Sequence, residues 1–275
     1  MKLALCNEVI RDLPFDRQCA FAAAVGFEGL EIAPFTLAEN PETLGEAEAR
    51  TVRAALEAEG LACCSLHWLL AAPEGVSITS ADPAVQRRTR DLMARLIDFA
   101  AAVGAPVMVH GSPAQRVLEE GAEADGRANA REAFAAAGAH AAKAGVEYLI
   151  EPLARRETDH INTIEEAADI VRAVDSPGLK TMLDTCATAS NDTDVVAELE
   201  AWWDTGLIRH IHVNDPNRRG PGEGTLAFGP IFKALHRLGY TGWVSAEPFV
   251  YLPDGPACAA RAAGTLTALR QELAP

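Results

Sequence analysis

The sequence has no excess of basic residues. Its 24 Lys and Arg stand against 39 Asp and Glu, which gives a formal net charge of −15 and a pI near 4.9. Proteins that grip the phosphate backbone of nucleic acids need clustered cations to displace counterions, so this balance argues against a nucleic-acid partner. An acidic surface favours solubility and indicates little else about function.

Long apolar runs and a secretory leader are also lacking. No stretch approaches the roughly 20 apolar residues that a membrane helix needs. The first residues, Met1–Cys6, are followed at once by Asn7, Glu8 and further charges, which is not the pattern of a signal peptide. We therefore expect a cytoplasmic protein with no membrane partner.

The cysteines lack C-x-x-C spacing. Two of them, Cys63 and Cys64, are neighbours in an apolar run, where their side chains point to opposite faces. This usage indicates a reducing compartment and packed, unpaired thiols. The six positions are Cys6, Cys19, Cys63, Cys64, Cys186 and Cys258.

Short β-type runs alternate with long stretches rich in Ala and charged residues. Helix boundaries carry familiar signals, such as Asp82-Pro83 at a start and Gly104 at an end. The predicted strands lie at residues 3–6, 29–33, 61–67, 106–110, 146–151, 179–184, 207–213 and 243–247. The predicted helices lie at residues 14–26, 45–59, 82–104, 128–144, 163–174, 193–203, 230–238 and 256–272.

Eight strand-then-helix units in a chain of 275 residues predict the α/β class and a (β/α)₈ TIM barrel, a single domain spanning 1–275. A doubly wound open sheet is the second choice. That fold places a dinucleotide site after its first strand, and no G-x-G-x-x-G motif follows the first strand here. In a barrel, working residues gather where the strands end.

Four consecutive predicted strands end in residues that bind metals. Glu151, Asp184, His212 and Glu247 are 33, 28 and 35 residues apart, about one strand–helix unit each. Any one of them alone could cap a helix or pair with an arginine. Together, three packed carboxylates would repel one another unless a dication lay between them. Three carboxylates and an imidazole suit Mn²⁺ or Mg²⁺, and the imidazole also admits Co²⁺ or Zn²⁺.

A dication between Glu151 and Glu247 suits proton transfer next to a carbonyl group. The ion would bind a hydroxyl and the carbonyl oxygen of a small polyol and stabilise the enediolate, while the two glutamates act as base and acid. This chemistry serves both epimerisation and aldose–ketose isomerisation. A metal-dependent lyase, dehydratase or hydrolase, and a non-catalytic sugar-binding barrel, are the alternatives.

Further segments accompany the four candidate metal ligands along the chain. They are Gly26–Glu31, Ile150–Leu153, Glu157-Thr158, Asn162-Thr163, Leu183–Thr185, His210–His212, Asp215, Asn217, Arg218, Pro221–Gly224 and Ser245–Glu247. With this set the chain resembles a known family, the xylose-isomerase-like TIM-barrel superfamily of sugar isomerases and epimerases, and in particular its ketose 3-epimerase and hydroxypyruvate-isomerase-like branch.

The resemblance implies that Glu151, Asp184, His212 and Glu247 bind one divalent metal, with Glu151 and Glu247 exchanging the substrate proton. It also implies that Glu157 and Arg218 hold the substrate. Ala187 is a departure, because ketose 3-epimerases have a substrate-contacting histidine at that position. This departure bears on the 3-epimerase activity itself and leaves the metal site untouched.

Three further histidines complete the candidate set. His67 and His110 end predicted strands and either line the substrate pocket or are packed structural histidines. His210 is expected on the opposite side of its strand from His212, packed or behind the ligands. The partner implied overall is a small sugar. The sequence leaves the oligomeric state open between a monomer and a homo-oligomer, for which a dimer is the usual default.

Overall fold

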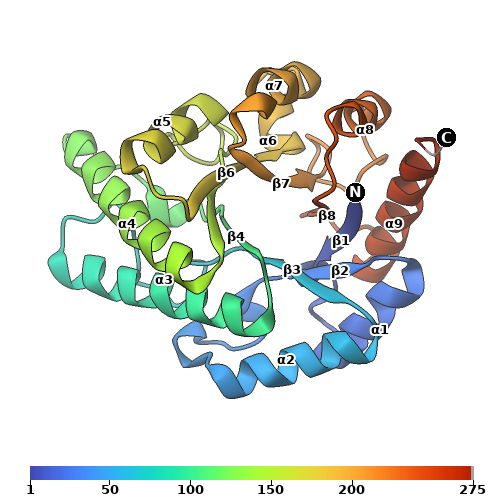
Figure 1. Ribbon diagram of the computed structural model, residues 1–275, viewed down its shortest axis with the longest axis horizontal. Helices are drawn as coiled ribbons and strands as arrows, with labels where there is room; N and C mark the ends of the chain where they lie inside the picture. The colour runs from blue at the N-terminus through green and yellow to red at the C-terminus, as the bar shows by residue number, and fades with distance from the viewer. Residues whose placement is uncertain (274–275) are drawn as a thin grey trace.

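The computed structural model describes residues 1–273, which form a closed barrel of parallel strands (Figure 1). Each strand pairs with the next along the chain, and β1 pairs with β8 to close the ring. The strands are β1 (Lys2–Cys6), β2 (Gly29–Ile32), β3 (Ala62–Leu66), β4 (Val107–His110), β5 (Glu147–Ile150), β6 (Leu179–Asp184), β7 (Ile208–Val213) and β8 (Trp243–Ala246). The predicted (β/α)₈ barrel is confirmed, and the open sheet is excluded. The last two residues of the predicted domain lie outside the described residues.

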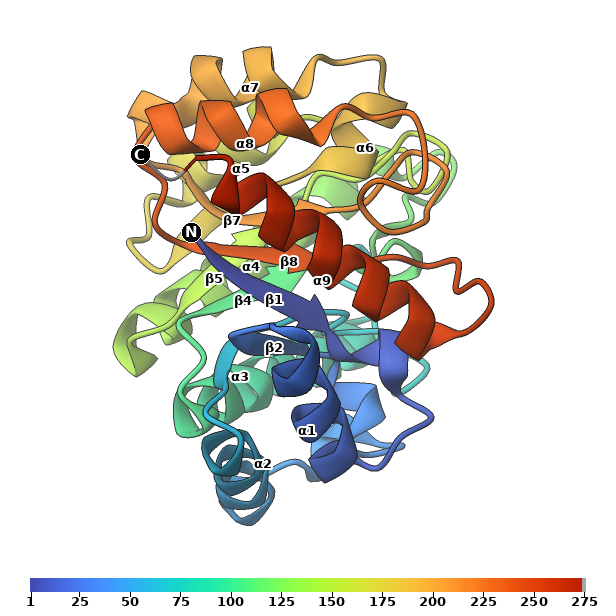
Figure 2. The ribbon, with the colours of Figure 1, turned by 90° about the vertical axis from the view of Figure 1, so that its right-hand side faces the viewer.

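Helices surround the barrel as an outer layer (Figures 1 and 2). They are α1 (Phe15–Val25), α2 (Glu46–Ala58), α3 (Pro83–Val103), α4 (Glu123–Ala144), α5 (Ile164–Val174), α6 (Thr185–Ser190), α7 (Val195–Trp202), α8 (Phe228–Arg237) and α9 (Gly255–Gln271). Within residues 1–273, no helix combines the length and apolarity that crossing a membrane requires.

Two helices differ from the prediction. α4 begins at Glu123 instead of Ala128, so its first turn includes Gly126 despite the low helix propensity of glycine. A Cβ atom at Gly126 would lie 3.0 Å from Leu118, so a glycine suits this close approach. The short α6 was not predicted, since its residues are small and polar. It forms because the side chain of Asp184 caps its first turn through the backbone N–H of Ala187.

The main apolar core lies between the outer faces of the strands and the helices, where Leu3, Leu30 and Phe232 are fully buried. A smaller apolar cluster fills part of the barrel interior. It contains Val107, Val109, Leu149 and Met182. Leu149 and Met182 each lie two residues before an acid of the predicted metal site, and residues two apart share a strand face. The site therefore rests on a partly apolar floor.

Candidate metal centre and active site

The four residues predicted to bind a metal meet at one end of the barrel. One ligand atom from each of Glu151, Asp184, His212 and Glu247 lies within 4.8 Å of the others. The His212 Nδ1 atom is 3.0 Å from Glu247 Oε2 and 3.3 Å from Glu151 Oε1. Neither oxygen lies in line for a hydrogen bond, so this buried nitrogen has no hydrogen-bonding partner. A nitrogen lone pair surrounded by carboxylates is what a cation requires.

Glu31 of β2 fixes the orientation of His212. Its Oε1 accepts a hydrogen bond from His212 Nε2 at 3.0 Å, and its Oε2 accepts one from His210 Nε2 at 2.7 Å. With the proton on Nε2, the Nδ1 lone pair of His212 faces the other acids. The expected side of His210 was wrong, because residues two apart point to the same side of a strand. Its expected place, packed behind the ligands, agrees with its contact to Glu31.

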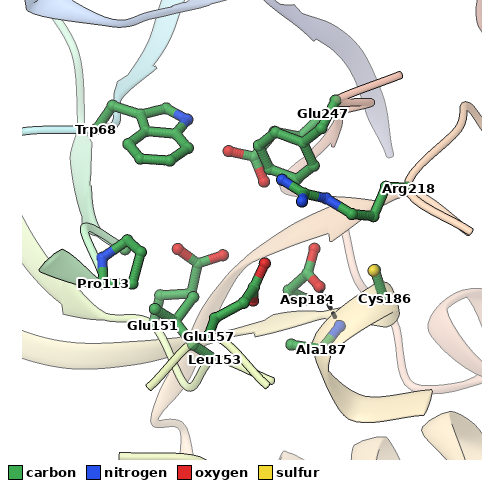
Figure 3. Close-up of a pocket in the computed structure, with 12 residues that line it drawn as sticks. Trp68, Pro113, Glu151, Leu153, Glu157, Asp184, Cys186, Ala187, Arg218 and Glu247 are labelled. Atoms are coloured by element: carbon green, nitrogen blue, oxygen red, sulfur yellow. Dashed lines mark hydrogen bonds between the residues drawn. The ribbon is translucent and has the colours of Figure 1, made fainter. Parts of the chain in front are cut away.

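The two carboxylate oxygens of Asp184 have different surroundings. Oδ1 accepts the hydrogen bond that starts α6, whereas the buried Oδ2 has no hydrogen-bonding partner and belongs to the metal-binding group. Figure 3 shows the carboxylate turned toward the same space as those of Glu151 and Glu247. Since a buried carboxylate oxygen without a partner is costly, the geometry fits a bound dication.

The electrostatics of the cluster are those of crowded, buried acids. Burial, together with the nearby Glu151 and Glu247 carboxylates, holds the pKa of Asp184 well above its usual value. Burial also raises the pKa of Glu151. Burial would raise the pKa of Glu247 too, but the attraction of His212 and the contact with His67 outweigh it and lower that pKa to about 2. The expected mutual repulsion is thus present for two of the three acids.

A cavity of about 230 Å³ opens over the three acids. Glu157 and Arg218, the two residues expected to hold substrate, both line it, and Figure 3 shows their charged groups turned into the same space. The Arg218 guanidinium also lies 4.8 Å from the centre of the Phe249 ring. Trp68 and Arg218 both have positive φ angles, of 51° and 67°, so the backbone is strained at two points of the cavity wall.

Ala187 lines the same cavity beside Cys186, so no donor side chain stands at this position. Apolar side chains make up much of the remaining wall. They are Trp68, Pro113, Leu153 and Phe249.

His67 and His110 do not line the cavity among the described residues. His110 is fully buried, its Nδ1 lies 2.7 Å from the Tyr148 hydroxyl, and its ring packs against Phe134 of α4, so it belongs to the layer between the strands and the helices. His67 instead contacts a catalytic candidate, with Nδ1 3.1 Å from Glu247 Oε1. The expectation that both histidines line the pocket was therefore wrong: His110 is a packed structural histidine, and the contact of His67 with the site is through Glu247.

Several residues of the site were missed by sequence reasoning. Glu31 belongs to the Gly26–Glu31 motif that carried the resemblance, so its position was noted but not its contact with His212. Buried Arg116 donates to the backbone oxygens of Glu151 and His110. It ends a short 3₁₀ turn at Ala114–Arg116 between β4 and α4, and no sequence pattern separates it from exposed arginines.

The comparisons with known proteins agree with this geometry. The family model described as xylose isomerase-like TIM barrel matches residues 19–269. A ketose 3-epimerase from Arthrobacter globiformis is 30% identical over 213 residues, which cover 75% of this chain and 71% of that protein. A 2-oxo-tetronate isomerase from Cupriavidus necator is 29% identical over 239 residues, which cover 83% and 84% of the two chains.

Solved structures share the fold. The crystal structure of a D-psicose 3-epimerase in the presence of D-fructose has a TM-score of 0.84 to this chain, at 22% identity over 99% of both chains. Together with the family match over most of the sequence, these likenesses assign the fold and the ancestry. The chain belongs to the xylose isomerase-like TIM-barrel family.

Proposed function

We propose that this chain is a divalent-metal-dependent isomerase or epimerase of a small sugar or keto-sugar. The observation that carries the proposal is the convergence of Glu151, Asp184, His212 and Glu247 under a cavity, with Asp184 Oδ2 and His212 Nδ1 left without hydrogen-bonding partners. The relatives that cover most of the chain include a ketose 3-epimerase and a 2-oxo-tetronate isomerase, whose chemistry is of this kind.

The four residues would hold the ion as three carboxylates and one imidazole. This donor set suits Mn²⁺ or Mg²⁺ best, and Co²⁺ or Zn²⁺ less well. When bound, the ion would supply a Lewis acid that polarises the substrate carbonyl. The chain's own residues would do the remaining work of binding and proton transfer.

Glu151 and Glu247 are proposed to move the substrate proton. They reach the site from β5 and β8, which are not neighbours in the barrel, and both oxygens lie within 3.3 Å of His212 Nδ1. For an epimerisation, one carboxylate removes the proton beside the carbonyl and the other returns one to the opposite face. For an isomerisation, the proton goes back to the adjacent carbon. Both reactions need the same pair.

The cavity limits the substrate. Its volume of about 230 Å³ is below the roughly 300–1,000 Å³ of sites for drug-sized ligands, which favours a monosaccharide or a shorter keto-acid. Among the described residues that line it, Arg218 is the one cation, and it faces four carboxylates. A phosphate group would be repelled there, so the substrate is proposed to be unphosphorylated.

The test is solvent exchange. The protein is incubated in D₂O with Mn²⁺ and a panel of ketoses, aldoses and keto-acids, and deuterium is followed by NMR at the carbon next to the carbonyl. We expect exchange that depends on the metal. Its absence over the whole panel would remove the isomerase and epimerase class and leave the lyase, dehydratase or hydrolase alternatives.

Variants assign the roles. Glu247→Gln and Glu151→Gln are each expected to reduce exchange by about 10²- to 10⁴-fold, the usual contribution of a general acid or base. Glu147→Gln is the matched control, because Glu147 starts β5 and pairs with Arg209 outside the site. Full activity in Glu247→Gln would take that residue out of the proton transfer.

A further inference from the structure

A second group of metal-binding residues lies against the first. It consists of Cys6, Glu8, His67 and Glu247, and one ligand atom from each lies within 4.8 Å of the others. Cys6 ends β1, Glu8 belongs to the 3₁₀ turn at Asn7–Ile10, and His67 follows β3. The proposed metal site described above uses none of the first three.

His67 resembles His212 in that one ring nitrogen contacts a glutamate and the other has no hydrogen-bonding partner. His67 Nδ1 is bound to Glu247 Oε1 at 3.1 Å, as His212 Nε2 is bound to Glu31. The other nitrogen of His67, Nε2, lies 2.9 Å from Glu8 Oε2 but is not in line for a hydrogen bond. With the proton on Nδ1, the Nε2 lone pair faces the Glu8 carboxylate, and a cation shared between them would join the two groups. Without such a cation, a second proton on His67 makes the same contact an ion pair, and against the effect of burial Glu8 and Glu247 together raise the pKa of His67 to about 10.

Glu8 adds an independent observation. Only 5% of the residue is exposed, and neither of its carboxylate oxygens has a hydrogen-bonding partner. A carboxylate held in this way has a large desolvation cost unless a cation compensates it. The Cys6 thiol beside it is fully buried among Glu8, Glu31 and Glu247.

We propose that Cys6, Glu8 and His67 form a second metal site, which takes Zn²⁺ and adjoins the first site through Glu247. A thiolate, an imidazole and a carboxylate are the donors of tetrahedral zinc, whereas the oxygen-rich first site favours harder ions. Tetrahedral zinc places its ligand atoms roughly 3–4 Å apart. The present separations are all within 4.8 Å, which is close to that spacing.

A metal ion in the second site would orient the carboxylate of Glu247 through His67. His67 would bind the ion through Nε2 and donate its Nδ1 proton to Glu247 Oε1, leaving Oε2 for the first site. His67 is then a positioning residue for Glu247. Trp68 and Glu247 both line the cavity, so the second group borders the cavity wall, from which an ion could enter.

Cobalt titration tests the proposal without any substrate. The metal-free protein is titrated anaerobically with Co²⁺, and absorption in the near ultraviolet reports thiolate–cobalt charge transfer. We expect two equivalents to bind, one of which produces that band. A competition titration with Zn²⁺ and a coloured chelator should also give two equivalents.

Variants separate the two sites. Cys6→Ser should lose the band and one equivalent, and Glu8→Gln should lose the same equivalent if Cys6→Ser fails to fold. Asp184→Asn should lose the other equivalent and keep the band. Cys63→Ser is the matched control, since its buried thiol contacts the Ser65 backbone oxygen of its own strand.

The outcomes are decisive for each site. A single equivalent without the band in the unaltered protein would overturn the second site and leave His67 as a protonated link between Glu8 and Glu247. A band that persists in Cys6→Ser would also overturn it. If Asp184→Asn changes nothing while the band depends on Cys6, the second site stands and the metal site of the proposed function fails.

Discussion

Two histidines of β7 share one carboxylate, and that sharing determines which nitrogen of His212 faces the acids. Both hydrogen bonds end on Glu31, which is completely buried. Carboxylates that orient a ligating histidine raise its basicity and fix its tautomer. At the scale of single residues, this contact fixes the orientation of the imidazole in the proposed metal site.

Glu31→Gln is expected to weaken Mn²⁺ binding by about 10- to 100-fold, because the neutral amide no longer holds the Nε2 proton of His212 in place. Metal titration followed by calorimetry measures the change. Glu28→Gln is the control, since Glu28 pairs with Arg270 at the surface. Equal affinity in Glu31→Gln and the unaltered protein would show that Glu31 does not set the tautomer.

Gly111 leaves room for Glu151. A Cβ atom at Gly111 would lie 1.6 Å from Glu151 Oε2, so Gly111→Ala must push the carboxylate aside. A displacement of this size costs about 100-fold in rate, and that loss is expected in the exchange assay. Gly229→Ala on α8, where nothing lies within 4 Å of the added carbon, should leave the rate unchanged. Similar rates in the two variants would contradict this account.

At the scale of elements, Arg116 joins the ends of β4 and β5. Its guanidinium is fully buried and donates to the backbone oxygens of His110 and Glu151, 2.5 and 2.8 Å away. Burial lowers the pKa of Arg116 to about 10, so its guanidinium is still protonated at neutral pH. The loop that carries Arg116 therefore holds two strand ends at a fixed spacing beneath the cavity.

Arg116→Met is expected to reduce the free energy of unfolding by about 2–4 kcal/mol, because two buried carbonyl groups lose their donor. Denaturant unfolding of the metal-free protein measures this. Arg50→Met is a suitable comparison, since Arg50 is exposed and pairs only with Glu46 one turn away. Exposed pairs of that kind contribute less than about 1 kcal/mol. A loss as small as that in Arg116→Met would contradict the role.

At the scale of the whole molecule, the acid cluster makes the barrel less stable without a cation. Burial and the adjacent Glu151 and Glu247 carboxylates raise the pKa of Asp184, which means that its ionised form is disfavoured in the folded state. A group of this kind takes up a proton more readily when folded. Its contribution therefore favours the folded state at low pH and is lost as pH rises.

Asp184→Asn is accordingly expected to stabilise the metal-free protein at pH 7 while removing the stabilisation that metal provides. For the unaltered protein, Mn²⁺ at about 100 times its dissociation constant should add about 2.7 kcal/mol, or roughly 5 °C in Tm. Thermal unfolding with and without Mn²⁺ measures both effects. An unchanged Mn²⁺ response in Asp184→Asn would show that the ion binds elsewhere.

Much of this organisation follows from the sequence. The alternation of strands and helices predicts the barrel, since each strand carries a local hydrophobic pattern and helices such as α3 and α4 end at a glycine, Gly104 and Gly145. The barrel in turn predicts that Glu151, Asp184, His212 and Glu247 meet, because parallel strands end at one mouth. Positions set by a repeated local pattern can be found without coordinates.

The tertiary structure alone decided contacts between elements far apart in the chain. Glu31 meets His212 across 181 residues, and His67 meets Glu247 across 180. No local pattern encodes such pairs, because each depends on barrel closure and on the direction of a single side chain. The same reason explains why His110 is packed against Tyr148. The sequence determined which strand ends carry the acids, whereas packing determined which atoms those acids and histidines present to one another.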